Sequence, residues 1–226
     1  GQFEQQLVVH APEYMHRTYL DPSSEDADIL RVSRQTLQRA LDLTKSLSAS
    51  FQGRPKFIVH PGGITLEKHP EPERLLETFA ETLSGLSADG IDVLPENLPP
   101  RPWVFGGEWA GNIFLVADEM EQFLQEQGYS MCFDTSHAAL ACHAAGVDLV
   151  DQVKTLKPYI KHLHVSDGAG IGEEGLQVGE GTVDWPAVMA ELAGYEHTMI
   201  PEIWQGHLHN GRGFLQAMGK LKKYMK

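Results

Sequence analysis

The sequence predicts an α/β protein in which parallel strands alternate with helices to form a (β/α) barrel. Two observations predict this fold class. Six strand-like apolar runs recur along the chain at a near-constant interval, and each ends at or near a histidine or a carboxylate. Between consecutive runs lies a stretch with apolar residues about every three to four positions, the period of an amphipathic helix. This alternation is typical of parallel α/β proteins, in which helices connect neighbouring strands.

The predicted elements follow one another in a regular order. Each strand is a short apolar run, and each helix is a longer stretch whose apolar residues share one face. Asn112 opens the third helical stretch and is a residue type that favours a helix N-cap. We expect strands at residues 7–10, 57–60, 93–97, 131–137, 162–167 and 199–202, and helices at residues 26–51, 73–86, 112–128, 137–146, 147–159, 185–195 and 214–224.

The spacing of the runs favours a barrel over a doubly wound sheet. From His10 to Glu202 the chain covers five repeats in 192 residues, or about 38 residues per βα unit. A doubly wound sheet draws its site from a few strands at one switch point, whereas all strand ends of a barrel face a common axis. Every run here ends in a functional type of side chain, which indicates the barrel.

The number of runs is smaller than a TIM-type barrel requires. Eight units of this length would need roughly 300 residues, within the usual range for the fold, and this chain has 226. We therefore expect one barrel domain over residues 1–226 that lacks the first two βα units of the usual eight. Because an open barrel exposes two strand edges, we expect either that the chain is truncated or partial, or that a partner segment or a second copy of the chain completes it.

The composition indicates a soluble acidic protein. The formal net charge is −13, so generic binding to nucleic acid is disfavoured. No signal peptide or long apolar segment is found, and the two cysteines, Cys132 and Cys142, form no CxxC motif. We expect both to be small buried residues in a reducing, cytoplasmic protein that is not inserted in a membrane.

Three carboxylates end strand-like runs. Asp134 lies three residues before His137, and either contributes to a site or caps the following helix through backbone amides. Glu96 and Glu202 each follow a proline and close an apolar run, where a free charge would be costly to bury. They are therefore ligands or catalytic groups, or else structural ion-pair partners of a basic residue such as Arg17, Arg101 or Lys161.

The histidines at the run ends are candidates for metal or substrate binding. His162 and His164 alternate on one strand and face the same side, with His164 nearer the carboxyl end and His162 one layer lower in the core. His10 and His60 occupy matching strand ends. We expect them to contact substrate or, together with Glu96, to hold a second metal ion.

Two loops are candidates for covering a substrate. The loop after Glu96 carries Trp103, Phe105 and Trp109, which either form an apolar lid against a sugar ring or pack against a neighbouring loop. The segment GLQVGEGTVDW, residues 175–185, is acidic and rich in glycine, and we expect it to be flexible and to cover substrate. It has no phosphate-binding fingerprint.

In the order HAP, HPG, PEN, FDTSHA, HLHVSD, GEGTVDW and PEI, these motifs resemble those of the xylose isomerase-like barrel superfamily. That superfamily includes sugar and sugar-phosphate isomerases and epimerases and the endonuclease IV family. The resemblance runs over nearly the whole chain and corresponds to the third through eighth units of such barrels. Single motifs are unspecific, but the ordered set is specific for the superfamily.

The epimerase pattern implies a divalent metal ion, Mn, Zn, Co or Mg, bound by Glu96, Asp134, His164 and Glu202. It also implies that Glu96 and Glu202 act as the acid–base pair on opposite faces of the substrate, while the metal stabilises the enediolate oxygens. His137 matches a position that contacts substrate in the epimerases and binds a third zinc ion in the endonucleases. The expected activity is a metal-dependent sugar or sugar-phosphate isomerase or epimerase of carbohydrate metabolism.

Two other functions stay open. The endonuclease pattern would use His10, His60 and Glu96 as zinc ligands in an enzyme that cleaves abasic DNA, but the Asp-x-His pair that completes its third zinc site is absent before the GEG loop. Alternatively, an incomplete barrel could serve as a non-catalytic interaction module.

Overall fold

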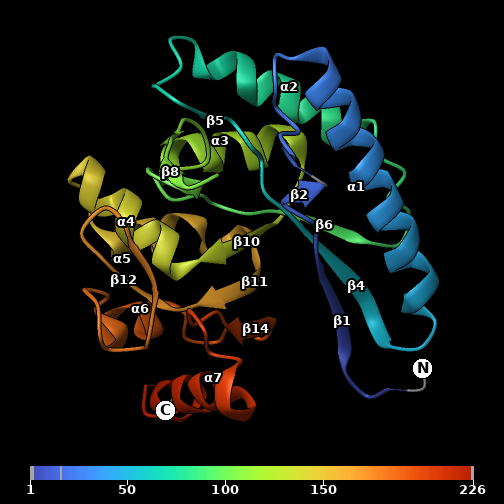
Figure 1. Cartoon of the computed structure of the whole chain (residues 1–226). Helices are drawn as coiled ribbons and strands as arrows, with labels where there is room; N and C mark the ends of the chain where they lie inside the picture. The colour runs from blue at the N-terminus through green and yellow to red at the C-terminus, as the bar shows by residue number, and fades with distance from the viewer. Residues whose placement is uncertain (1–2, 16, 225–226) are drawn as a thin grey trace.

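The computed structural model of the chain, which describes residues 3–15 and 17–224, contains a curved parallel sheet with helices outside it (Figure 1). Its strands lie side by side in chain order: β1 (Gln6–His10), β4 (Gln52–Val59), β6 (Asp92–Pro95), β10 (Met131–Asp134), β11 (Ile160–Val165) and β14 (Thr198–Pro201). A parallel bridge between Glu96 and Cys132 joins the first three strands to the last three. The predicted α/β architecture and strand order are confirmed.

Helices follow the strands as the apolar periodicity predicts. Those that connect the strands pack on the outer face of the sheet, where Phe57, Phe133 and Leu163 are fully buried in the main hydrophobic core. The helices are α1 (Ala27–Ser48), α2 (Pro72–Ser84), α3 (Ala117–Gln127), α4 (Thr135–Ala145), α5 (Leu149–Leu156), α6 (Trp185–Glu191) and α7 (Leu208–Leu221). Among the described residues, no helix is both long and apolar enough to cross a membrane.

The inner face of the sheet forms a second, smaller apolar layer. Ile58, Leu94 and Cys132 are buried there with Val8 packed against them. They alternate along their strands with the outward residues, as the period of two in a β-strand requires. Side chains one layer nearer the carboxyl ends of the strands project into the candidate site.

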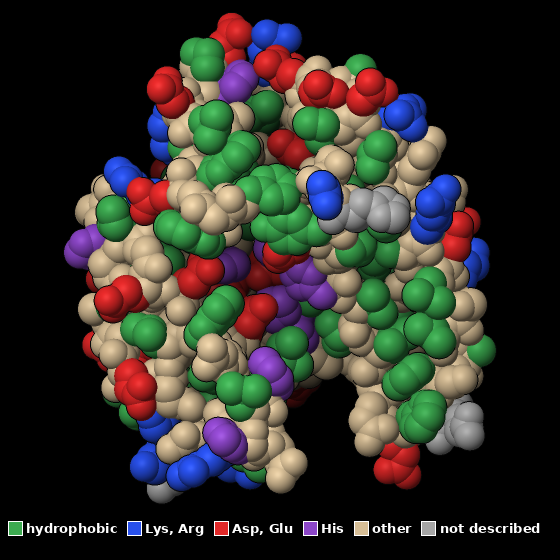
Figure 2. Space-filling view, viewed as in Figure 1, with side chains coloured by type: hydrophobic (Ala, Val, Ile, Leu, Met, Phe, Trp, Pro, Cys, Tyr) green, Lys and Arg blue, Asp and Glu red, His purple; other side chains and the backbone are tan. Residues whose placement is uncertain are grey.

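The sheet is open between β1 and β14 among the described residues, because each of these strands pairs with only one neighbour. Figure 2 shows the molecule hollowed between its N-terminal and C-terminal parts. Ile200 pairs in register with His164 and is 43% exposed. Solvent therefore reaches the inner face of the sheet along this side.

The third helix begins later than its sequence pattern indicates. Asn112 does not cap it; the helix begins at Ala117 after Val116. The Asn112 side chain instead donates to the carbonyl oxygen of Gly63 at 2.8 Å and to the Thr65 hydroxyl at 2.7 Å. It thereby joins the loop after β4 to the loop after β6. Asn112 therefore holds two loops together instead of capping a helix, because its side-chain amide binds residues that are distant in the sequence.

The glycine-rich segment after β11 is held firmly, contrary to its predicted flexibility. The buried Asp167 carboxylate accepts hydrogen bonds from the backbone of Gly168, Gly179 and Val183 and from the Trp185 indole, at 2.8–3.0 Å. A Cβ at Gly181 would lie 2.4 Å from Asp167 Oδ1. The glycines therefore let the chain wrap closely around a buried carboxylate.

Candidate metal centre

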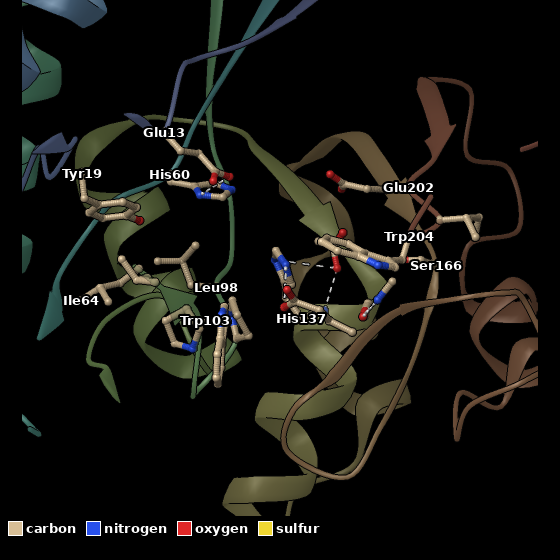
Figure 3. A pocket seen from close by; sticks show the side chains of 18 of the residues that line it. Glu13, Tyr19, His60, Ile64, Leu98, Trp103, His137, Ser166, Glu202 and Trp204 are labelled. Carbon is tan, nitrogen blue, oxygen red and sulfur yellow. Dashed lines mark hydrogen bonds and ion pairs between the residues drawn. The ribbon is translucent and has the colours of Figure 1, made fainter. Parts of the chain in front are cut away.

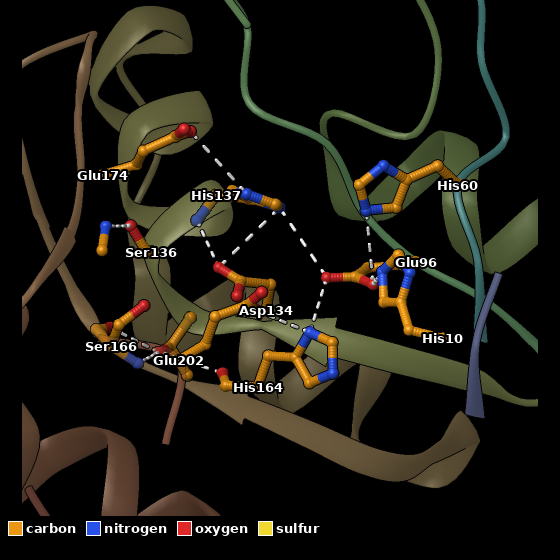
Figure 4. A network of polar contacts seen from close by, with 12 residues as sticks. His10, His60, Glu96, Asp134, Ser136, His137, His164, Ser166, Glu174 and Glu202 are labelled. Atoms are coloured by element: carbon orange, nitrogen blue, oxygen red, sulfur yellow. Dashed lines mark hydrogen bonds and ion pairs between the residues drawn. The ribbon is translucent and has the colours of Figure 1, made fainter. Parts of the chain in front are cut away.

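The carboxyl ends of the central and C-terminal strands bring four predicted ligands together. Glu96 follows β6, Asp134 ends β10, His164 lies in β11 and Glu202 follows β14. One ligand atom from each lies within 4.8 Å of the others. Parallel strands deliver their last side chains to one edge of a sheet, which explains how residues far apart in the sequence meet here (Figure 4).

His164 lies between two of these carboxylates. Its Nδ1 is 2.9 Å from Glu96 Oε1 and 2.8 Å from Glu202 Oε2. Burial alone would lower the pKa of His164, but Glu96 and its other partners raise it well above the ordinary value for histidine. The same contact with His164 overcomes the effect of burial on Glu202 and lowers its pKa to about 2. The His164 ring thus lies between Glu96 and Glu202 at the centre of the carboxylate cluster.

Glu96 connects this cluster to the N-terminal strands. It is fully buried, and its Oε2 lies 3.3 Å from His10 Nε2 and 3.5 Å from His60 Nε2. Burial raises the pKa of Glu96, yet His164, His10 and His60 outweigh it and hold the pKa well below its usual range. His10, His60 and Glu96 also offer ligand atoms within 4.8 Å of one another, as do Glu96, Cys132 and His164, so Glu96 belongs to three groups of candidate ligands.

Asp134 caps the following helix, which is one of the two roles that its sequence pattern allowed, and it also lies in the candidate ligand cluster. Its Oδ1 accepts a hydrogen bond from the backbone of His137 at 2.7 Å and caps helix α4. Burial raises the pKa of Asp134 to about 7; the charge of His137 opposes the rise, whereas Glu202 and Glu96 add to it. The cap therefore sits inside a crowded set of carboxylates that repel one another.

Asn97 is a structural residue of the site that the sequence pattern did not reveal. It is fully buried, its Nδ2 donates to the Asp134 carbonyl oxygen at 2.9 Å, and its Oδ1 accepts from the Asp134 amide at 2.8 Å. Its own carbonyl oxygen lies 3.0 Å from His137 Nδ1. The Asn97 side chain therefore extends the hydrogen bonding between β6 and β10 by binding the backbone of Asp134. Its position directly after Glu96 was the available signal.

The donor set fits a divalent cation. Glu96, Asp134 and Glu202 provide three carboxylates around one imidazole, and Glu96 Oε2 and His164 Nε2 are buried without a hydrogen-bond partner. Among the ion pairs of the described residues, Glu96 and Glu202 have histidines and no lysine or arginine as partners. A buried carboxylate without such a partner, as Glu96 is, is typical of metal sites.

A cleft of about 460 Å³ lies beside the cluster and is lined by Asp134, His137 and Glu202, among others (Figure 3). Trp103 lines this cleft and is 69% exposed. Trp109 is absent from its lining and packs against Ile64, Leu98 and Val104.

Trp204, which sequence reasoning passed over, lines the cleft and is 75% exposed. Its place two residues after Glu202 was the available signal. Of the two histidines at the ends of the N-terminal strands, His60 lines the cleft and His10 does not.

Comparison with known proteins supports the fold. D-tagatose 3-epimerase-like protein has a solved structure that superposes with a TM-score of 0.74 at 22% identity, covering 98% of this chain and 78% of that chain. Endonuclease IV from Thermus thermophilus superposes with a TM-score of 0.62 at 17% identity, covering 97% and 75%.

An uncharacterized protein of Methanocaldococcus jannaschii, MJ1311, is 25% identical over 229 residues, covering 99% of this chain and 71% of the relative. Residues 3–224 match the family described as xylose isomerase-like TIM barrel. Since that match spans nearly the whole chain, the protein belongs to the xylose isomerase-like TIM barrel family.

Proposed function

We propose that the protein is a metal-dependent isomerase or epimerase that acts on a sugar or sugar phosphate by proton transfer. The observation that carries the proposal is the packing of Glu96, Asp134, His164 and Glu202 within 4.8 Å at the strand ends. The names of structural neighbours add support, since they include D-tagatose 3-epimerase-like protein and L-ribulose 3-epimerase.

In this proposal the four residues hold one divalent ion, which would act as a Lewis acid toward substrate oxygens. Glu202 removes or returns the proton next to the substrate carbonyl, because it is the member of the pair that lines the cleft. Glu96 is the second member of the acid–base pair. It is buried and absent from the cleft lining, whereas its neighbour His60 lines the cleft.

The remaining predicted residues have supporting roles in the proposal. His60 and His137 line the cleft and contact substrate, whereas His10 positions Glu96. Trp103 is the part of the predicted lid that borders the cleft, and Trp109 supports it from behind. We place the enzyme in the cytoplasm, where its two free, buried cysteines stay reduced.

Solvent exchange tests this function and does not require the product to be identified first. The Mn²⁺-loaded protein is incubated with ketohexoses and their phosphates in D₂O, and NMR follows deuterium entering the carbon next to the carbonyl. We expect exchange to stop in Glu202→Gln and to persist in the control Glu180→Gln, a carboxylate that is 62% exposed and pairs with Lys220. Absence of Mn²⁺ binding, or exchange that survives Glu202→Gln, contradicts the proposal.

A second candidate function is an endonuclease IV-like phosphodiesterase that acts on abasic DNA. The His10, His60 and Glu96 group favours it, because it offers a further cation site next to the first. The cleft lining argues against it, since it contains no lysine or arginine that could meet a phosphate. Cleavage of an abasic duplex by the zinc-loaded protein, without deuterium exchange into sugars, would favour the nuclease.

We also propose that the strands occupy the third to eighth positions of an eight-stranded barrel. The unpaired edges of β1 and β14 support this, as does the 71–78% coverage of the longer relatives. A partner segment or second copy would then slow hydrogen exchange at those edges.

A protein that binds no metal, and whose biological role survives Glu202→Gln, would instead be a non-catalytic interaction module.

A further inference from the structure

The cleft has two chemically different sides. Ile64, Leu98 and Val104 form a small hydrophobic cluster separate from the main core, and all three line the cleft. With Trp103 they make up what we call the apolar wall. In Figure 3, Ile64, Leu98 and Trp103 lie on one side of the cleft, and Glu202 and Trp204 lie across from them. The candidate metal ligands Asp134 and Glu202 border the same space.

The apolar wall is built in advance of any ligand. Asn112 binds Gly63 and Thr65 on either side of Ile64, and a strand pair between β5 (Ile64–Thr65) and β9 (Ala110–Gly111) fixes the same loops. Leu98 is 1% exposed and Val104 is 3% exposed. Trp103, on β7 (Trp103–Val104), is 69% exposed, so its ring remains free to be covered.

The charges of the cleft side chains disfavour a strongly anionic ligand. Among the described residues, the lining contains the carboxylates of Glu13, Asp134, Glu174 and Glu202 and no lysine or arginine, and its basic side chains are those of His60 and His137. Phosphate groups are bound in proteins by arginine, lysine and helix N-termini. A dianion in this cleft would therefore face four carboxylates without the lysine or arginine that usually binds it, whereas hydroxyl groups can donate to the same carboxylates.

From these observations we infer that the cleft binds an uncharged polyhydroxylated molecule that carries a planar apolar substituent. Its hydroxylated end lies at the candidate metal centre and its substituent lies against the apolar wall. The volume of about 460 Å³ is within the range of sites that enclose drug-sized ligands. The inference rests on the proposed function, because that function places the hydroxylated end, and it narrows the substrate to a neutral one.

Hydroxamates provide a direct test, because they chelate a divalent ion through two oxygens and differ only in their substituent. The affinities of acetohydroxamate, benzohydroxamate and phenylacetohydroxamate for the Mn²⁺-loaded protein are compared by calorimetry. At least one aromatic member is expected to bind about tenfold more tightly than acetohydroxamate, the factor expected for removing roughly 60 Å² of apolar surface from water. Trp103→Ala removes the difference.

The matched control is Phe105→Ala. Phe105 is an exposed aromatic residue of the same loop that does not line the cleft, so this variant should keep the full difference. Equal affinities across the series, or a difference that survives Trp103→Ala, overturns the inference and leaves the proposed function standing. Lack of Mn²⁺ binding refutes the proposed function instead.

A metal-independent measurement completes the test. Benzyl alcohol added to the metal-free protein should shift the indole N–H resonance of Trp103. A competing possibility is that a second copy of the chain covers the apolar wall. Concentration-dependent dimerisation that is lost in Trp103→Ala, with no shift on adding benzyl alcohol, would establish that occupant and refute ours.

Discussion

Replacement of Asn97 by alanine should weaken both the fold and the affinity of the candidate centre for a metal ion. The Asn97 side chain makes two hydrogen bonds to the backbone of Asp134, at 2.9 and 2.8 Å, and all of these groups are buried. Their loss leaves the amide and carbonyl groups of Asp134 without partners. Each unsatisfied buried group costs about 1–3 kcal/mol, so for the two groups we expect a loss of about 2–6 kcal/mol in unfolding free energy.

The effect on the metal ion follows from the position of Asp134. A residue that orients a metal ligand typically changes metal affinity about 10–100-fold when it is removed. We therefore expect Asn97→Ala to weaken Mn²⁺ binding by a factor in this range, measured by calorimetry at a temperature where circular dichroism shows the variant to be folded.

Asn112→Ala is the matched control for this prediction. Asn112 is also buried, and its amide also joins two loops by hydrogen bonds, but it lies outside the ligand set. It should lower stability and leave Mn²⁺ affinity unchanged. If Asn97→Ala is destabilised while its Mn²⁺ affinity equals that of the unmodified protein, then Asn97 does not position Asp134 and the reasoning is wrong.

Two further predictions concern the loops and a buried acid. Gly181→Ala brings a Cβ within 2.4 Å of Asp167 Oδ1 and should lower the unfolding free energy by about 2 kcal/mol or more. Gly172→Ala is the control, because no neighbouring atom lies within 4 Å of its Cβ, and it should leave stability nearly unchanged. Equal urea midpoints for the two variants would contradict this prediction. Burial raises the pKa of Glu119 from 4.5 to about 7 despite the opposing charge of Lys68. The folded state therefore binds this proton more tightly than the unfolded state, and its contribution to stability falls by roughly 3 kcal/mol as pH rises from about 4.5 to 7. Glu119→Gln should remove that decline in urea titrations at pH 5 and pH 8, and a decline of equal size in both proteins would refute the assignment.

The strand ends could be predicted because their information is local. Each of Glu96, Asp134, His164 and Glu202 ends an apolar run, and the geometry of a parallel sheet brings such ends together whatever the distant contacts are. The prediction that His162 and His164 face the same side followed in the same way, from alternation along one strand.

Other features depend on contacts between residues that are far apart in the sequence. Asn97 contacts Asp134 across 37 positions and Asn112 contacts Gly63 across 49, so the local sequence does not show which partners these side chains bind. The glycines around Asp167 indicated flexibility by composition, whereas their actual role is to let four donors reach one carboxylate. The left-handed backbone at His209 and Asn210, which interrupts α7, has no signal of its own beyond the glycine that follows.

Asp134 links the candidate metal centre to helix α4, because the same carboxylate belongs to both. One carboxylate ends β10, accepts the His137 amide at the first turn of α4 and belongs to the ligand cluster. A cation bound to this carboxylate competes with the His137 amide for its electron density. Binding of a metal ion at the centre therefore weakens the hydrogen bond that caps the helix. The first turn of α4 would thereby report the filling of the site through its rate of amide hydrogen exchange.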